Sequence, residues 1–330
     1  MSSEKSLILA TPEGIGRIPI SKKRSLGSFE QTLKEVAMEA VCQDSSGVLY
    51  AGADKGKIYR SKDNGLAWEK VFEGFPNSRG LWSLVAPPLK PGTLYAGLEP
   101  VSIWESVDQG VQWQELKSLR THPSSKNWEF YEPSKPHIRA ISFDAKGERF
   151  YVGIEVGGIL VSKNGGGTFE DKSQGVNQDF HTIQVSPQNP DHLFGMTGDG
   201  LFRSKDGGNH WEKLEKGIDR WYFIPLAFVS KDTKYLCVGA GNNSPAVWRT
   251  KGADAAIYWS KNGGDAWEKA NGPFPLRGML SAIISNPENP KDLFASTTDG
   301  LLLRTLDGGK NWDIAKDNLP RIEEMVFHGE

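Results

Sequence analysis

The sequence predicts an all-β fold, a seven-bladed β-propeller of four-stranded antiparallel blades, and three observations support this prediction. A motif of the form [S/T]-x-[D/N]-x-G-x-x-[W/F] recurs six times along the 330 residues. Short segments rich in β-branched and aromatic residues, which are typical of strands, lie at matching positions around each copy. The two ends of the chain hold complementary parts of one further repeat. Repeated sets of four short strands are typical of propellers.

The six motifs begin 42 to 56 residues apart. They are SKDNGLAW (61–68), SVDQGVQW (106–113), SKNGGGTF (162–169), SKDGGNHW (204–211), SKNGGDAW (260–267) and TLDGGKNW (305–312). An Asp or Asn side chain caps backbone N–H groups of its own turn, and Gly adopts the positive φ that a tight turn requires. A calcium site is not expected, because the closing Glu of a calcium loop is absent. We therefore expect a structural role for Asp63, Asp108, Asn164, Asp206, Asn262 and Asp307.

Each repeat contains four expected strands in a fixed order. First strands are expected at 37–43, 81–88, 138–144, 181–187, 223–230 and 280–287. Second strands follow at 49–54, 94–99, 150–155, 193–198, 235–240 and 293–298. A third strand leads directly into each motif, and a fourth begins after its aromatic residue.

The two ends of the chain predict how the ring closes. Residues 7–20 match a second and a third strand, and residues 322–329 match a first strand. We expect the C-terminal strand to become the innermost strand of blade 1, which would remove the open sheet edges. One domain over residues 1–330 follows from this arrangement.

The six motifs resemble the Asp box, or BNR repeat, and the chain is similar to the Asp-box propeller superfamily over nearly its whole length. That superfamily includes sialidases, some xyloglucan-cleaving glycosidases, the sortilin-type receptors and a photosystem II assembly factor. The resemblance implies a propeller whose motifs lie at the blade periphery, away from the active sites. Arg17-Ile18-Pro19 resembles an Arg-Ile-Pro motif of sialidases, but it falls on a third strand and not on an innermost one. Genuine sialidase activity is therefore not expected.

The composition argues against two classes of partner. The formal net charge is −2, which does not favour nucleic acid or an acidic membrane surface. No segment reaches the roughly 18 apolar residues of a membrane span, and the apolar run Leu7–Ala10 is too short for a secretory signal. The cysteines, Cys42 and Cys237, are expected to be buried thiols. We expect a cytoplasmic protein.

Two long insertions indicate the working face. They span about 116–136 and 240–257. Strand order places both on the face that carries the strand 4–1 and strand 2–3 loops, called the top face here, with the six motifs on the opposite face. Long loops on a regular scaffold concentrate binding residues.

Polar and aromatic side chains gather on the same face, where first strands begin and strand 2–3 loops end. Arginines there could bind carboxylate, phosphate or sulfate, while carboxylates and histidines could act as acid–base groups or metal ligands. The expected ligand-binding residues are Arg79, Trp82, Arg139, Arg220, Trp221, Tyr222, Arg277 and Arg321. The catalytic candidates are Glu99, His137, Glu155 and His181, of which His137, His181 and Glu155 would hold a divalent metal if one binds.

The sequence leaves two functions open. The favoured one is an axial pocket for a small polar or anionic molecule or a carbohydrate, with glycosidase-like hydrolase or lyase activity. The alternative is a non-enzymatic propeller that docks a protein partner on its top face, as the assembly-factor relatives imply. Catalysis requires His137, Arg139, Glu155 and His181 to converge within hydrogen-bond reach, whereas docking requires a broad aromatic surface such as 128–131.

Overall fold

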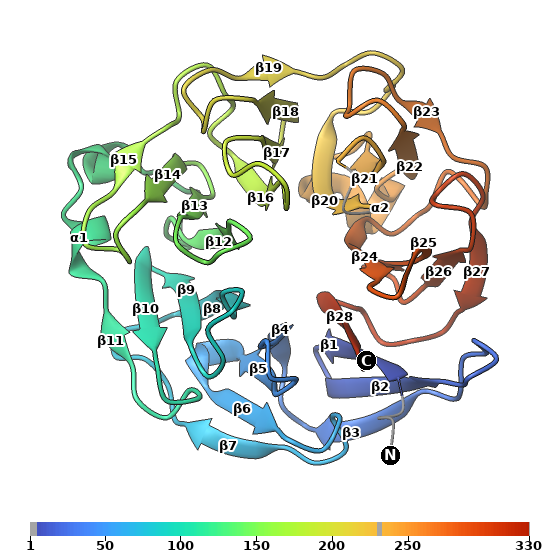
Figure 1. Cartoon of the computed structure of the whole chain (residues 1–330), viewed down its shortest axis with the longest axis horizontal. Helices are drawn as coiled ribbons and strands as arrows, with labels where there is room; N and C mark the ends of the chain where they lie inside the picture. The colour runs from blue at the N-terminus through green and yellow to red at the C-terminus, as the bar shows by residue number, and fades with distance from the viewer. Residues whose placement is uncertain (1–4, 230–232, 330) are drawn as a thin grey trace.

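The computed structural model of the chain describes residues 5–229 and 233–329 and confirms the predicted propeller. Within these residues, seven sheets of four antiparallel strands are arranged in a ring (Figure 1). In each sheet the first strand lies nearest the centre of the ring, and the later strands follow outward (Figure 1).

Blades 2 to 7 each use four consecutive strands, ordered here from the centre outward. Blade 2 consists of β4 (Met38–Gln43), β5 (Leu49–Ala53), β6 (Ile58–Ser61) and β7 (Glu69–Phe72), and blade 3 of β8 (Gly80–Val85), β9 (Leu94–Glu99), β10 (Ser102–Ser106) and β11 (Gln114–Glu115). Blade 4 consists of β12 (Ile138–Phe143), β13 (Phe150–Ile154), β14 (Gly158–Ser162) and β15 (Glu170–Asp171), and blade 5 of β16 (Phe180–Val185), β17 (Leu193–Thr197), β18 (Gly200–Ser204) and β19 (Glu212–Lys213). Blade 6 consists of β20 (Tyr222–Phe228), β21 (Leu236–Gly241), β22 (Ala255–Ser260) and β23 (Glu268–Lys269), and blade 7 of β24 (Leu280–Asn286), β25 (Asn289–Thr297), β26 (Leu302–Thr305) and β27 (Asp313–Lys316).

Blade 1 joins the two ends of the chain, as predicted. Its strands from the centre outward are β28 (Glu324–His328), β1 (Lys5–Thr11), β2 (Gly14–Ile20) and β3 (Glu30–Lys34). β28 pairs antiparallel with β1, with Met325 opposite Leu9, and both side chains are buried. Arg17 lies on β2, the third strand of this blade, where it forms an ion pair with Glu30.

The core consists of apolar layers between neighbouring blades. The layer between blades 7 and 1, for example, contains Leu9 of β1, Met325 of β28 and Phe294 of β25. Glycines on the second strands allow the next blade to approach closely. A Cβ atom at Gly97 would lie 2.6 Å from Ile138 Cγ2 of blade 4, so a larger residue would push these two blades apart.

The side chains of the six motifs form hydrogen bonds within their own turns. In the turn at 204–211, Ser204 Oγ donates to Asp206 Oδ1 at 2.9 Å and accepts from the Gly208 N–H at 2.9 Å. Asp206 Oδ1 also accepts from the His210 N–H at 2.9 Å. The other five turns contain corresponding contacts, centred on Asp63, Asp108, Asn164, Asn262 and Asp307. This local bonding explains through turn geometry why the Ser/Thr, Asp/Asn and Gly positions of the motif recur.

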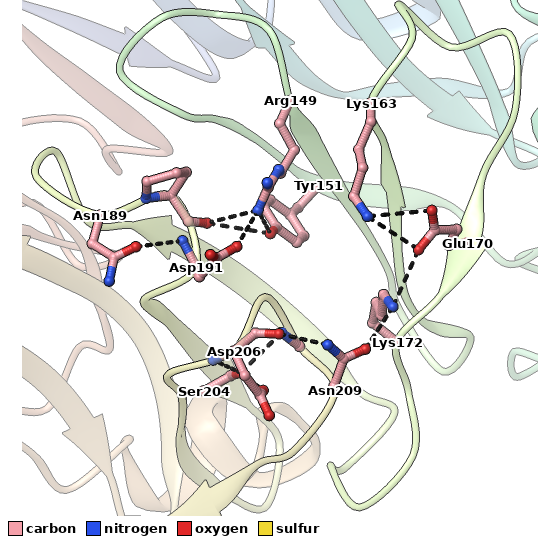
Figure 2. Close-up of polar contacts among 12 residues, drawn as sticks. Arg149, Tyr151, Lys163, Glu170, Lys172, Asn189, Asp191, Ser204, Asp206 and Asn209 are labelled. Atoms are coloured by element: carbon pink, nitrogen blue, oxygen red, sulfur yellow. Dashed lines mark hydrogen bonds and ion pairs between the residues drawn. The ribbon is translucent and has the colours of Figure 1, made fainter.

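One motif turn also joins two blades, as Figure 2 shows. Asn209 Nδ2 donates to the Asp206 carbonyl at 2.7 Å, and Lys172 Nζ of blade 4 donates to Asn209 Oδ1 at 2.7 Å. Glu170 lies between Lys172 and Lys163 on the outer strands of blade 4 (Figure 2). These exposed polar contacts lie at the boundary of blades 4 and 5 and supplement the apolar layer between them.

Each of the two insertions contains short helical structure that the strand pattern did not indicate. The first contains α1 (Lys117–Arg120) and a 3₁₀ turn at Pro123–Asn127, and the second contains α2 (Pro245–Lys251). α1 lies at the outer edge of the ring, beside blade 3 (Figure 1). Within the described residues, no helix has the length and apolar character needed to cross a membrane.

Candidate functional site

The seven inner strands surround an axial cavity of about 340 Å³. Its lining includes Glu39 (β4), Trp82 (β8), Arg139 (β12), His181 (β16), Ile224 (β20), Ser281 (β24) and Glu324 (β28). Most of these residues lie near the beginning of their strands, where the sequence placed its candidate site. The cavity therefore brings together side chains from all parts of the chain.

A buried ion cluster lies beside the cavity, and its Arg139 side chain lines it. Glu155 Oε2 contacts His137 Nε2 at 2.9 Å and accepts from Arg139 Nη1 at 2.7 Å. The pairing of β12 with β13 explains this contact. Ile138 lies opposite Ile154, and His137, which precedes Ile138, therefore lies near Glu155, which follows Ile154. His137 Nδ1 also faces a carbonyl oxygen, that of Lys135 at 3.1 Å. Both ring nitrogens of His137 thus face acceptors, and a doubly protonated ring would donate to both.

Glu155 is held in its ionised form by these partners. Burial alone would raise the pKa of Glu155, but the Arg139 charge and the His137 hydrogen bond outweigh burial and hold the pKa well below its usual range. A carboxylate in this state is suited to orienting Arg139 and His137 and is a poor proton donor. Its predicted catalytic role stays a prediction.

Aromatic rings cover this ion cluster. Trp82 stacks on His137 with ring centroids 3.8 Å apart and an interplanar angle of 20°. Arg139 Cζ lies 5.8 Å from the centre of the Trp82 ring, within cation–π range. Glu99 holds Trp82 in place, because its Oε2 accepts from Trp82 Nε1 at 3.1 Å and its Oε1 accepts from the Lys135 N–H at 2.9 Å. These contacts favour a positioning role for Glu99.

Each of the two insertions contacts one of the predicted site residues. Phe130 of the first insertion packs edge-on against His137 at 5.0 Å between ring centroids. Trp248 of α2 packs edge-on against Tyr222 at 5.5 Å, and Tyr222 in turn contacts His181 at 4.5 Å. The first insertion therefore contacts the predicted site at His137, and the second contacts it at Tyr222.

His181 belongs to a second polar group beside the ion cluster. Its Nδ1 lies 2.6 Å from the Phe223 carbonyl oxygen, and its Nε2 lies 3.6 Å from Asp179 Oδ1. Potential ligand atoms of Glu155, Asp179 and His181 all lie within 4.8 Å of one another. In this group Asp179 occupies the place that the sequence had suggested for His137, whose Nε2 faces Glu155.

Acidic residues line the wall across the ring, between β4 and β28 (Figure 1). Burial raises the pKa of Glu39 to about 7, with smaller contributions from Glu323 and Asp54. Burial also raises the pKa of Glu324 to about 7, although the Val41 N–H donates to its Oε2 at 2.9 Å. Glu323 and Glu324 are not among the site residues predicted from the sequence, although their position at the start of the closing strand was a usable signal.

A pH-dependent gain in stability is expected when Glu324 is replaced by Gln. The raised pKa in the folded state means that stability declines as pH rises from about 4.5 to about 7, because the carboxyl of the unfolded chain ionises over this interval while the buried carboxyl keeps its proton. Gln keeps the acceptor for the Val41 N–H but carries no charge. We expect the melting temperature to rise by about 2–5 °C at pH 8 and to change little at pH 4.5. Thermal melts of the wild type and Glu324→Gln at the two pH values measure this effect, and Glu170→Gln is the control at an exposed position. A gain in melting temperature that is the same at both pH values would contradict the prediction.

The other predicted ligand-binding residues lie outside the cavity lining. Arg220 forms ion pairs with Asp219 at 2.6 Å and Asp254 at 3.0 Å, and Arg321 pairs with Glu323 at 2.5 Å. Arg79 donates to the Pro133 carbonyl at 2.7 Å, Trp221 donates to the Asn242 carbonyl at 2.9 Å, and Arg277 is exposed near Gly252. Contact with a ligand stays a prediction for these residues.

No protein-family model matches the chain, and no curated protein is similar enough in sequence to count as a relative. Solved structures do resemble it. The GH74 xyloglucanase from Xanthomonas campestris is 16% identical with a TM-score of 0.70, and the match covers 96% of this chain and 53% of the enzyme. YCF48 from Cyanidioschyzon merolae is 15% identical with a TM-score of 0.63 and coverages of 92% and 96%. A YCF48 bound to D1 peptide is 14% identical with a TM-score of 0.60 and coverages of 92% and 94%.

The two kinds of neighbour differ in how much of them the chain matches. The chain spans about half the length of the GH74 enzyme and nearly the whole of YCF48. One neighbour acts on a carbohydrate and the other is seen with a peptide. At these identities the likeness shows the fold alone: the chain is a seven-bladed β-propeller of an architecture shared by glycoside hydrolases and by a peptide-binding protein.

Proposed function

We propose that this propeller binds an anionic group, a carboxylate above all, at the top of its axial cavity, and that Arg139 is the central contact. The observation that carries the proposal is that the Arg139 guanidinium is fixed by its neighbours but still partly exposed at the cavity. Glu155 fixes it through Nη1 and Trp82 lies beside it, yet 26% of its side chain is exposed at the cavity. Among the residues that the structure describes, none accepts from its Nε or Nη2.

A fixed arginine is well suited to this task. Glu155 and Trp82 restrict the rotamers of Arg139, so less side-chain entropy is lost when a ligand binds. The planar guanidinium can then offer two parallel N–H groups to a carboxylate. Burial of Glu155 and His137 behind the arginine reduces screening by water and strengthens the interaction.

A peptide is the favoured carrier of the carboxylate. The chain matches almost the whole of a propeller that was solved with a peptide, whereas it matches only about half of the GH74 enzyme. The aromatic residues Phe130 and Tyr131 at the rim, the second of which is 83% exposed, add apolar surface for a partner. A free C-terminus or an Asp or Glu side chain would supply the group that contacts Arg139.

Glycoside hydrolysis is a second candidate function, and one observation favours it. Glu324 has a pKa raised to about 7 and lines the axial cavity, and the ionised Glu155 contacts Arg139, which lines the same cavity. A protonated carboxyl and an ionised carboxyl are the two groups that glycosidases use. Hydrolysis of xyloglucan oligosaccharides that is lost in Glu324→Gln would support this candidate, and its absence in the wild type would remove it.

The binding proposal is tested with acetylated dipeptides in two forms, with a free C-terminal carboxylate and with an amide. Calorimetric titration of the wild type should show binding of the acid form only. Arg139→Lys keeps the charge but loses the planar pair of donors, and we expect it to weaken binding about 10-fold or more. Arg120→Ala, at an exposed arginine paired with Glu115, is the control. Equal binding of acid and amide forms, or unchanged binding in Arg139→Lys, would overturn the proposal.

A further inference from the structure

We propose that His181, Asp179 and Glu155 form a site for one divalent transition-metal ion of the zinc class, at the top of the axial cavity. The inference goes beyond anion binding and does not rest on it. The three residues come from blades 4 and 5, whose inner strands β12 and β16 are adjacent in the ring (Figure 1). Potential ligand atoms of all three lie within 4.8 Å of one another.

The hydrogen bonding of His181 prepares its ring for a cation. Nδ1 lies 2.6 Å from the Phe223 carbonyl, which can only accept, so the proton of a neutral ring is on Nδ1. Nε2 then carries a lone pair. The side chain is 2% exposed, and the buried Nε2 has no hydrogen-bond partner in the described part of the chain. An Nδ1–H bonded to a backbone carbonyl is the usual support of a metal-binding histidine.

Asp179 presents a second unpaired acceptor to the same point. Its Oδ1 is buried without a hydrogen-bond partner among the described residues and lies 3.6 Å from His181 Nε2. That separation is too long for a hydrogen bond. It is close to the roughly 3.4 Å expected for two atoms that share a tetrahedral zinc ion at about 2.0–2.1 Å. Two lone pairs that face each other in a buried site are stabilised by a cation between them.

Glu155 can supply the third ligand without losing its present partners. Its Oε2 contacts His137 and Arg139, and no described residue donates to Oε1. The carboxylates of Glu155 and Asp179 outweigh the single charge of Arg139, so the site attracts a dication. One nitrogen and two carboxylate oxygens form a ligand set that suits Zn²⁺ and similar ions. His181 lines the cavity, and Asp179 is partly exposed, which leaves a path for the ion.

The competing explanation is an ion pair between a doubly protonated His181 and Asp179. Both explanations use the same residues, so loss of stability in a variant does not separate them. Direct binding of a metal ion does.

The experiment titrates the chelator-treated chain of 330 residues with Co²⁺ and then adds Zn²⁺ as a competitor. We expect one Co²⁺ per chain with visible d–d absorption, displaced by Zn²⁺. His181→Gln and Asp179→Asn should each weaken metal binding by at least about 100-fold. His192→Gln is the matched control, because His192 also has a buried, unpartnered Nε2 but lies outside the cluster of Glu155, Asp179 and His181. Circular dichroism checks that every variant is folded. If His181→Gln does not fold, Asp179→Asn still tests the site, because Asp179 is partly exposed.

Absence of Co²⁺ and Zn²⁺ binding at millimolar concentration, or binding that Asp179→Asn leaves unchanged, would overturn the metal site. The titration contains no carboxylate ligand, and the dipeptide titrations with the Arg139 variant are repeated with a chelator present. Failure of the metal site therefore leaves anion binding measurable, and failure of anion binding leaves the metal titration intact.

Discussion

Replacing Glu155 by Ala is expected to lower the free energy of unfolding by about 3 kcal/mol, because the change leaves the Arg139 charge without its counter-charge in a largely buried site. The same change removes the acceptor of His137 Nε2, which is fully buried. Denaturant titration at pH 7 measures the effect. Glu170→Ala is the matched control, since its ion pairs with Lys163 and Lys172 are exposed and should contribute no more than about 0.5 kcal/mol.

The pH dependence gives this prediction a second measurement. The pKa of Glu155 is depressed in the folded state, so its contribution is fully present above the ordinary pKa of a glutamate and is lost as pH falls below it. The gap in stability between the wild type and Glu155→Gln should narrow below about pH 4. A double variant with Arg139→Met should recover part of the loss, because the unpaired charge is then absent. Equal effects at Glu155 and Glu170 would contradict the prediction.

Truncation of the chain after Arg321 is expected to abolish cooperative folding. The deletion removes β28, so β1 becomes an exposed inner edge and the ring loses its closure. It also removes Ile322 and Met325 from the apolar layer that joins blades 7 and 1. We expect a fall in melting temperature of more than about 10 °C, or aggregation, because the loss of buried core residues lowers the free energy of unfolding by several kcal/mol. Thermal melts with a check of aggregation by light scattering provide the measurement.

A pair of substitutions controls for the loss of chain length. Met325→Asp places a charge on β28 where the side chain is 2% exposed, and Ile314→Asp makes the same kind of change on the outer strand β27, where the side chain is 49% exposed. Only Met325→Asp should reproduce much of the fall in melting temperature that the truncation causes. A truncated chain that melts like the wild type would show that the ring does not depend on closure by β28.

The blade plan could be predicted from the sequence because its signals are local. A turn such as 204–211 satisfies its own backbone with Ser204, Asp206 and Gly208, so the same residue types recur wherever that turn is needed. The strand pattern around each turn then gives the order of strands within a blade. The matching of residues 322–329 to the missing first strand of blade 1 predicted the closure that β28 forms with β1.

The site was predicted only in part, because similar residues at similar positions met different neighbours. Arg139 and Arg220 both come from the region where a first strand begins, yet Arg139 lines the cavity while Arg220 is bound by Asp219 and Asp254. Sequence spacing does not show which acceptor lies within reach of an arginine. The partners of Arg220 become visible only when blade 6 is assembled.

The sequence by itself determined the number of blades, the pairing of the two chain ends and the region of the inner strands where polar residues gather, since turn chemistry and strand periodicity act over a few residues. Only the tertiary structure decided that Glu155 is ionised between His137 and Arg139, and that His181 and Asp179 face each other with unpaired atoms. It also decided that Glu324 holds its proton up to about pH 7. These properties depend on burial and on charges from different blades, and the folded ring alone brings those groups together.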